Sequence, residues 1–333
     1  MKKDLLLIAH FCSDFDGKGN NRFNYLANLF SENEFDVELI TSDYSHSKKE
    51  KRSKETKREI NYNVTFIEEP SYRKNVSFKR FYSHYIMGRN LNKYLKYRKK
   101  PDIIYCAVPS LDVAKVAAKY AAKNNIRFII DVQDLWPEAF KMVFNMPIFS
   151  NILFFPIKKQ ADYIYAAADE IIAVSQTYVD RALQVNKKAK KGYSIFLGTE
   201  LQAFDRFAKD NAVKDKPEGE IWIGYVGTLG HSYDLTSVID ALAILQKKGI
   251  KNIKFIVMGD GPLKTQFEKQ AKANNVYVEF TGRLDYGKMV GLLNSCDIAV
   301  NPISKGAASS IINKHADYAA AGLPIINTQE CQE

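Results

Sequence analysis

Two glycine-rich loops are the first parts of this chain whose residue types could do chemistry. Gly17 and Gly19 follow an apolar run near the N-terminus and precede a helical pattern, and Gly227 and Thr228 follow the apolar run 221–226. Glycine lets backbone N–H groups come close to a phosphate, and a helix N-terminus favours its negative charge. Both loops therefore predict contacts with a phosphate group, although a bare turn also needs glycine.

Three side chains in the second half could neutralise such a phosphate. His231 lies soon after the second glycine loop, Arg283 follows a short apolar run, and Lys314 stands at the start of a predicted helix. We interpret Lys314 as the best candidate to stabilise a leaving phosphate. Solvated surface positions are the alternative for His231 and Lys314.

Asn313 and Asp317 belong to the same predicted helix, residues 313–321. The carboxylate of Asp317 can accept hydrogen bonds from two neighbouring hydroxyls of a ligand. The start of the helix near Asn313 presents unpaired N–H groups, which suit a phosphate. A solvated helix face is the alternative for Asp317.

Two acidic residues in the first half stand where an apolar run ends, in the segment 131–138 (DVQDLWPE). In a parallel sheet the carboxyl ends of strands meet at the ligand-binding edge. Asp134 or Glu138 could there orient a substrate hydroxyl or accept its proton. The alternative for Asp134 is a helix N-cap ahead of Trp136 and Pro137.

Asp14 and Asp16 form a pair with the spacing that holds a divalent ion in some enzymes. The pair precedes the first glycine loop instead of following a late strand, so we interpret the spacing as chance and expect no metal. The four cysteines lack CxxC or metal-ligand spacing and are expected to be reduced and mostly buried.

Short apolar runs rich in β-forming residues alternate with helical patterns along almost the whole chain, which is the signature of an α/β fold with parallel sheets. In the first half, strands are predicted at 5–10, 37–41, 64–67, 103–106, 128–132, 170–174 and 193–196. In the second half, strands are predicted at 221–226, 254–258, 276–280, 298–301 and 324–327.

The polar stretch 209–220 separates the two series of strands. We predict a first domain at residues 1–198, a connection at 199–220 and a second domain at 221–333. The second series stops after its fifth strand with no helix behind it. Because a parallel sheet is covered by helices on both faces, the second domain is expected to be incomplete at its C-terminus.

The order of these motifs resembles the retaining glycosyltransferases of family 4, and within them the branch that builds bacterial surface polysaccharides such as capsule and lipopolysaccharide. The resemblance rests on the segment 131–138, on the turn 259–262 (GDGP), and on Asn313, Lys314, Asp317 and Tyr318, which fit the pattern N-K-x-x-D/E-Y. It implies the GT-B fold, in which two Rossmann-like, doubly wound parallel-sheet domains face a central cleft. The first domain would bind the acceptor and the second the nucleotide sugar.

The chain departs from the family pattern at three places. Many relatives carry a histidine near residues 131–138, an arginine where this chain has Thr228, and a glutamate where it has Ser309. Asp317 falls at the position of a second glutamate, which in the family binds the ribose hydroxyls. Because this chain lacks the family's arginine at Thr228, other cations would have to neutralise the diphosphate.

The resemblance implies transfer of a sugar from a nucleotide-sugar donor, with UDP as the expected nucleotide, to a saccharide or lipid-linked acceptor, with retention and without a metal. The implied catalytic residues are Asp134, Glu138 and Lys314. The implied donor contacts are Gly17, Gly19, Gly227, Thr228, His231, Arg283, Asn313 and Asp317. Two alternatives stay open: a catalytically inactive nucleotide-sugar-binding protein, and a nucleotide-sugar epimerase of the same fold.

The net charge of +10 is concentrated between Ser47 and Lys100, where 17 Lys and Arg face 5 Glu. Within this tract Phe78, Tyr82 and Tyr85 follow helical spacing among basic residues. Such a helix suits an anionic membrane surface, and an aromatic stripe facing the core is the alternative. No recognised nucleic-acid-binding motif accompanies the tract, so nucleic acid is not an expected partner.

The apolar run near the N-terminus spans only residues 5–9, which is too short for a signal peptide or for the roughly 18 residues of a membrane span. We therefore expect a cytoplasmic protein that is peripheral at the inner face of the membrane.

Overall fold

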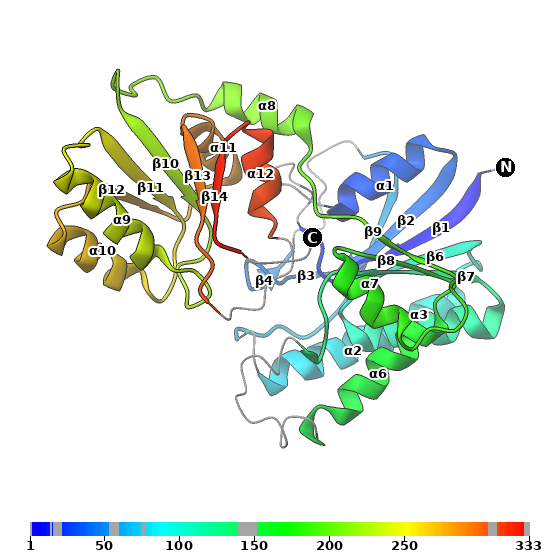
Figure 1. The fold of residues 1–333 in the computed structure, drawn as a ribbon. Coiled ribbons are helices and arrows are strands. Elements are labelled where there is room, and N and C mark those ends of the chain that lie inside the picture. Colours follow the sequence, from blue (N-terminus) through cyan, green and yellow to red (C-terminus); the bar gives the residue numbers. More distant parts are fainter. Residues whose placement is uncertain are drawn as a thin grey trace. The chain divides into compact units, whose positions relative to one another are not determined.

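The computed structural model describes residues 2–13, 15, 22–52, 60–74, 77–138, 152–305 and 312–329. The described residues form two compact units, the first running up to Phe196 and the second starting at Leu197. Each unit has its own parallel sheet with helices on both faces (Figure 1).

The first unit contains a seven-stranded sheet in the order β5-β2-β1-β6-β7-β8-β9, with every pairing parallel. Its strands are β1 (Lys3–Ile8), β2 (Phe35–Ser42), β5 (Asn63–Ile67), β6 (Ile103–Val108), β7 (Arg127–Val132), β8 (Glu170–Ala173) and β9 (Gly192–Ser194). A short antiparallel hairpin of β3 (Tyr44–Ser45) and β4 (Glu50–Lys51) follows β2.

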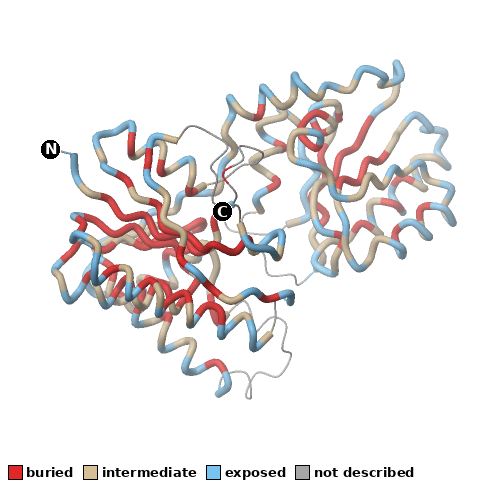
Figure 2. Tube along the Cα trace, turned by 180° about the vertical axis from the view of Figure 1, so that it is seen from behind, coloured by how far each residue is buried: buried red, intermediate tan, exposed pale blue. Residues whose placement is uncertain are grey.

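The alternation of side chains along β1 assigns the helices of the first unit to two faces, because successive residues of a strand point to opposite sides of the sheet. Leu5 and Leu7 pack with α1 (Arg22–Glu32) on one face. Leu6 and Ile8 belong to the cluster on the other face. That cluster includes α2 (Phe78–Tyr97), α3 (Leu111–Asn124), α6 (Phe155–Ala167) and α7 (Gln176–Leu183). Figure 2 shows the buried strands running between more exposed helices.

The second unit contains a five-stranded sheet in the order β12-β11-β10-β13-β14. Its strands are β10 (Ile221–Val226), β11 (Ile253–Met258), β12 (Val278–Gly282), β13 (Ile298–Asn301) and β14 (Ile325–Asn327). One face packs against α9 (Leu235–Lys247) and α10 (Lys264–Ala273). The other packs against α8 (Leu201–Asp210), α11 (Tyr286–Leu293) and α12 (Lys314–Ala320).

Both sheets contain a point at which the strand order reverses. In the first sheet this point lies between β1 and β6, and in the second between β10 and β13. In open parallel sheets, ligands bind outside the carboxyl ends of the strands at such a point. The residues that follow these strands are therefore the candidate ligand contacts.

Every strand predicted from the sequence is present, with ends displaced by no more than two residues. The patterns did not predict α8, which lies inside the expected connection 199–220. Apolar residues of this ten-residue helix pack into the core of the second unit. Phe204 is 1% exposed within the second core, and a Cβ on Gly291 of α11 would lie only 2.1 Å from the backbone oxygen of Asn211. Close backbone approach of this kind requires glycine.

None of the helices in the described ranges combines the length and the apolar character that a membrane crossing requires.

We expect Phe204→Ala to destabilise the second unit by about 3–5 kcal/mol, because it removes a buried aromatic side chain and leaves a cavity. Phe78→Ala is the matched control, since Phe78 is 94% exposed, and should change stability by less than about 0.5 kcal/mol. Calorimetric unfolding of both variants measures the difference. Equal stability of the two would contradict the docking of α8 in the core.

Candidate functional site

A buried lysine lies next to the point where the second sheet reverses its strand order. Lys314 is the first residue of α12 and is only 6% exposed. Its Nζ lies 4.2 Å from the ring centroid of Tyr225 and 3.8 Å from that of Tyr233. Among the described residues Nζ has no hydrogen-bond partner. Burial lowers the pKa of Lys314 to about 7, so the site holds a desolvated amine that an anion would stabilise in its charged form.

The glycine loop after β10 allows this lysine to approach. Gly227 has φ 148°, a conformation that disfavours side chains, and a Cβ there would lie 3.1 Å from Lys314 Nζ. The GDGP turn packs against the same loop, because a Cβ on Gly259 would lie 1.8 Å from the Gly227 oxygen. The two glycine motifs seen in the sequence therefore serve one compact loop pair at the carboxyl edge of β10 and β11.

Asp317 lies one turn after Lys314 on α12. Its Oδ1 accepts hydrogen bonds from Thr199 Oγ1 at 2.7 Å and from the Tyr286 hydroxyl at 2.8 Å. None of the described residues donates a hydrogen bond to Oδ2. Burial raises the pKa of Asp317, and the two hydrogen bonds oppose this effect. The carboxylate is thus held in place through one oxygen.

Tyr318 fastens α12 to the sheet. Its hydroxyl accepts a hydrogen bond from the Val226 N–H at 2.9 Å and donates one to the Val300 carbonyl at 3.2 Å. These two residues belong to β10 and β13, the strands that flank the reversal of strand order. The sequence pattern included Tyr318 only as part of a motif, and its hydrogen-bonding role became visible in the structure.

The other residues predicted to contact the donor in this unit are exposed: Thr228, His231, Arg283 and Asn313. The backbone oxygen of Thr228 accepts a hydrogen bond from the Tyr225 hydroxyl at 2.9 Å, and that of His231 accepts one from Ser304 Oγ at 2.8 Å. Arg283 follows β12 directly. The part of the chain that the structure describes gives these four side chains no fixed partner.

The two acidic residues predicted in the first unit follow β7 and are both engaged locally. The carboxylate of Asp134 accepts hydrogen bonds from the Leu135 N–H and from the Trp136 indole at 2.9 and 3.2 Å. Glu138 Oε1 pairs with Arg181 Nε at 2.6 Å, while Oε2 is buried without a partner among the described residues. Burial raises the pKa of Asp134. Both oxygens of Asp134 are thus engaged within its own segment.

Gly17 and Gly19 lie outside the described residues, as do Asp14, Asp16 and Ser309. The helix that follows the first glycine loop begins at Arg22. Arg22 Nε lies 2.8 Å from Oδ2 of Asp131, a fully buried carboxylate that also accepts a hydrogen bond from Tyr105. This ion pair fixes the start of α1 at the carboxyl edge of β7, and sequence spacing gave no signal for it.

A histidine does lie next to Trp136, although none is near it in the sequence. The ring of His84, on α2, stacks on the Trp136 ring with centroids 5.9 Å apart and planes inclined by 12°. The two residues are 52 positions apart (136 minus 84), so only the tertiary structure brings them together.

Two family models match this chain. Residues 19–199 match the model described as Glycosyltransferase Family 4, and residues 220–333 match the model described as Glycosyl transferases group 1. An uncharacterized glycosyltransferase of Methanocaldococcus jannaschii is 27% identical over 164 residues, which are 48% of this chain and 41% of that protein.

A Campylobacter jejuni enzyme is 32% identical over 68 residues, which are 20% of this chain and 19% of that enzyme. Its name describes an α-1,4-N-acetyl-D-galactosaminyltransferase with a PP-undecaprenol-linked acceptor. The chain thus spans less than half the length of either curated relative in these alignments.

Solved glycosyltransferase structures share the fold. Anabaena HepE in complex with UDP-glucose has a TM-score of 0.59 at 13% identity, covering 98% of this chain and 80% of that one. WaaG, a glycosyltransferase involved in lipopolysaccharide biosynthesis, has a TM-score of 0.60 at 13% identity, with 97% and 80% covered. Sucrose-phosphate synthase from Thermosynechococcus elongatus reaches 0.63 at 15% identity, with 98% and 81% covered. The expected GT-B architecture of two parallel-sheet α/β domains is confirmed.

We expect the stability of the protein to depend on pH through Lys314. The pKa of this lysine is about 7 in the folded state and 10.5 in the unfolded state, so between these values the unfolded chain binds more protons and stability rises with pH. Lys314→Met removes this dependence. Its Tm should exceed that of the wild type by roughly 3 °C or more at pH 6.5, and the difference should shrink toward pH 10.

Lys247→Met is the control for this measurement, since Lys247 is exposed at the end of α9. Its Tm should follow the wild type at every pH. Parallel pH profiles for Lys314→Met and the wild type would show that the Lys314 ammonium is not buried in solution.

Proposed function

The chain belongs to glycosyltransferase family 4, and we propose that it transfers a sugar from a nucleotide-sugar donor to a saccharide or lipid-linked acceptor. One observation carries the proposal: the desolvated amine of Lys314 and the held carboxylate of Asp317 lie one turn apart at the carboxyl edge of the second sheet. A cation for a diphosphate and an acceptor for sugar hydroxyls are the two groups that a nucleotide sugar needs.

Asp317 binds the ribose hydroxyls of the donor in this proposal. Thr199 and Tyr286 hold Oδ1, which leaves Oδ2 to accept from the ribose. We propose UDP as the nucleotide, which is supported by the UDP-glucose complex of the similarly folded HepE. Gly17, Gly19, Gly227, Thr228, His231, Arg283 and Asn313 complete the proposed donor contacts.

Lys314 stabilises the leaving diphosphate. Binding of the diphosphate here requires little reorganisation, because the amine is already desolvated and lies over two tyrosine rings. Arg283, exposed behind β12, is the second proposed cation. With these two charges we propose a transfer that needs no metal and proceeds with retention by attack from the face of the leaving group.

The acceptor hydroxyl is oriented in the first unit by Asp134 or Glu138. Both residues follow β7 at the carboxyl edge of the sheet. Glu138 Oε2 has no partner among the described residues, whereas both oxygens of Asp134 accept hydrogen bonds from Leu135 and Trp136. Glu138 is therefore the better placed of the two to receive a proton.

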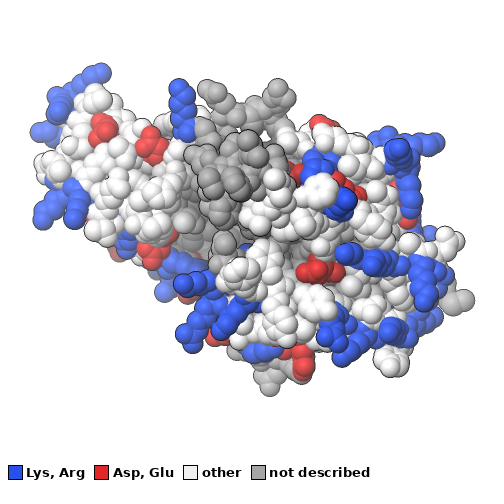
Figure 3. Space-filling view, turned by 90° about the horizontal axis from the view of Figure 1, so that it is seen from below, with Lys and Arg blue, Asp and Glu red and all other residues white. Residues whose placement is uncertain are grey.

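The helix α2 supports a lipid-linked acceptor at an anionic membrane surface. A single stripe on this helix holds Phe78, Tyr82, Tyr85, Arg89, Lys93 and Lys96, all exposed. The opposite stripe, with Met87 and Leu91, faces the core, so the aromatic residues named in the sequence do not point inward. Figure 3 shows that basic side chains outnumber acidic ones on the side that carries α2 and α6.

Aromatic rings followed by basic groups along one helix face are suited to the interface of an anionic bilayer. The undecaprenol-linked acceptor in the name of the Campylobacter jejuni relative also supports this assignment. We propose that the protein is cytoplasmic, works at the inner face of a bacterial membrane, and contributes to a surface polysaccharide such as capsule or lipopolysaccharide.

Calorimetric titration with UDP and GDP, with EDTA present, tests the donor site. We expect UDP to bind and Asp317→Ala to weaken it at least tenfold, because the ribose loses a charged hydrogen-bond acceptor. Asp240→Ala, on the exposed side of α9, should bind as the wild type does. Equal binding by Asp317→Ala would rule out this ribose site, and binding without transfer to any acceptor would favour an inactive nucleotide-sugar-binding protein.

Co-sedimentation with vesicles that contain phosphatidylglycerol tests the membrane surface. The triple variant Arg89→Gln, Lys93→Gln, Lys96→Gln should bind at least tenfold more weakly, since each basic residue near an anionic bilayer contributes about 1 kcal/mol. The double variant Lys269→Gln, Lys272→Gln on α10 is the control and should bind normally. Loss of vesicle binding in the α10 control alone would place the membrane-binding surface on the second unit and contradict its assignment to α2.

A further inference from the structure

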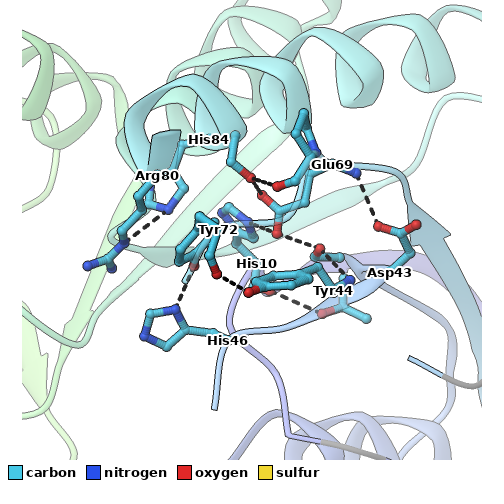
Figure 4. A network of polar contacts seen from close by, with 12 residues as sticks. His10, Asp43, Tyr44, His46, Glu69, Tyr72, Arg80 and His84 are labelled. Atoms are coloured by element: carbon cyan, nitrogen blue, oxygen red, sulfur yellow. Dashed lines mark hydrogen bonds and ion pairs between the residues drawn. The ribbon is translucent and has the colours of Figure 1, made fainter. Parts of the chain in front are cut away.

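A polar cluster that the donor site does not use lies at the carboxyl edge of β1, β2 and β5 in the first unit (Figure 4). At its centre the Glu69 carboxylate, 1% exposed, accepts hydrogen bonds from Ser42 Oγ and Ser83 Oγ, both at 2.6 Å. His10 Nε2 lies 3.0 Å from the same carboxylate. Burial alone would raise the pKa of Glu69, but His10 and the two serines lower it to about 2. Glu69 is therefore an ionised carboxylate held by hydrogen bonds from the groups around it.

Two cations lie on aromatic rings beside this carboxylate. The guanidinium of Arg80, on α2, is 5.0 Å from the centroid of Trp136 and 5.5 Å from that of Phe11. The amine of Lys49, in the β3–β4 hairpin, is 5.0 Å from the centroid of Tyr72. Both side chains are half-buried, so water screens their charges only in part.

The positively charged side chains of this cluster lower the pKa values of the basic groups around them. Burial lowers the pKa of Lys49, and the positive charge of Arg80 lowers it further. Burial and then the charges of Lys49 and Arg80 lower the pKa of His46 to about 4. Burial, followed by His10 and Arg80, lowers the pKa of His84 to about 2. Burial lowers the pKa of Arg80, while Tyr72, Asp134 and Glu69 act to raise it. The positive charge of Arg80 is thus felt by Lys49, His46 and His84.

We propose that Arg80 and Lys49 form an anion-binding site in the first unit, which takes a phosphate or carboxylate group carried by the acceptor. This inference rests on the proposed glycosyl transfer and specifies the class of acceptor. A bound anion would relieve the repulsion between the two cations, and the guanidinium, whose Nε donates to His84 Nε2 at 3.4 Å, is a group that binds either anion.

The surroundings also suit a sugar ring next to the anion. The Phe11 ring stacks on His10 and has Arg80 over it, while the half-buried His46 ring, with its centroid 5.0 Å from that of Phe11, keeps part of its surface open to solvent. Figure 4 shows Arg80 and His46 on the same side of Tyr72, whose hydroxyl lies 2.5 Å from His46 Nδ1. Aromatic faces present a flat apolar surface on which the C–H side of a sugar can stack.

The test is calorimetric titration of the full chain with inorganic pyrophosphate and, separately, with glucuronic acid. All titrations use the Lys314→Met background, so that the proposed donor phosphate site does not contribute. We expect one of the two probes to bind and Arg80→Gln to weaken it at least tenfold, with a smaller loss for Lys49→Gln. Binding of pyrophosphate identifies a phosphorylated acceptor, and binding of glucuronic acid identifies an acidic sugar.

Arg206→Gln is the matched control, because Arg206 also lies on an aromatic ring, 5.4 Å from the centroid of Phe207 in the second unit. It should bind the probe as the background protein does. Arg80→Lys keeps the positive charge and covers the case in which Arg80→Gln perturbs folding. It should recover part of the affinity for the probe. A site-resolved NMR titration adds a second readout, in which a bound anion raises the pKa of His46.

Absence of binding by both probes, or binding that is unchanged in Arg80→Gln, would overturn the proposal. Neither result bears on the donor, because UDP binding is measured separately on the chain with Lys314 intact. If the protein binds pyrophosphate through Arg80 but does not bind UDP, the anion site is supported and the proposed transferase function is contradicted.

Discussion

The hydrogen bonds of the Tyr318 hydroxyl connect the short helix α12 to β10 and β13, the two strands between which the strand order of the second sheet reverses. One bond comes from the Val226 N–H and the other goes to the Val300 carbonyl. A seven-residue helix has little stability of its own, so tertiary contacts must define its position. Because Lys314 and Asp317 lie on this helix, the geometry of both proposed donor contacts depends on where Tyr318 holds it.

Each unit keeps cationic side chains partly out of water, with aromatic rings beside them. In the second unit Lys314 lies over Tyr225 and Tyr233, and in the first unit Arg80 lies over Trp136. Rings compensate a desolvated cation only in part, because their attraction is weaker than that of a carboxylate. Such sites reduce the stability of the empty protein and favour the binding of anions, which agrees with the proposed donor and acceptor.

Much of the fold could be predicted from local patterns. Apolar runs identified each strand of both sheets, and the alternation within β1 matches the division of its side chains between two cores. The helix α8 was missed although Leu201, Phe204 and Ala208 follow helical spacing, because its segment was assigned to the connection between the two series of strands. The motifs around Gly227, Gly259 and Lys314 were recognised as separate segments, and their meeting at one edge follows from parallel strand order.

The sequence by itself determined the α/β class, the two series of strands and the residue types available for phosphate and hydroxyl recognition, because these depend on periodicity and side-chain chemistry. Only the tertiary structure decided which groups meet. It buried Lys314 between two tyrosines, tied Asp317 to Thr199 and Tyr286, and gathered His10, Glu69 and Arg80 at one sheet edge. Burial and pKa arise from neighbours distant in the chain, and no local spacing encodes them.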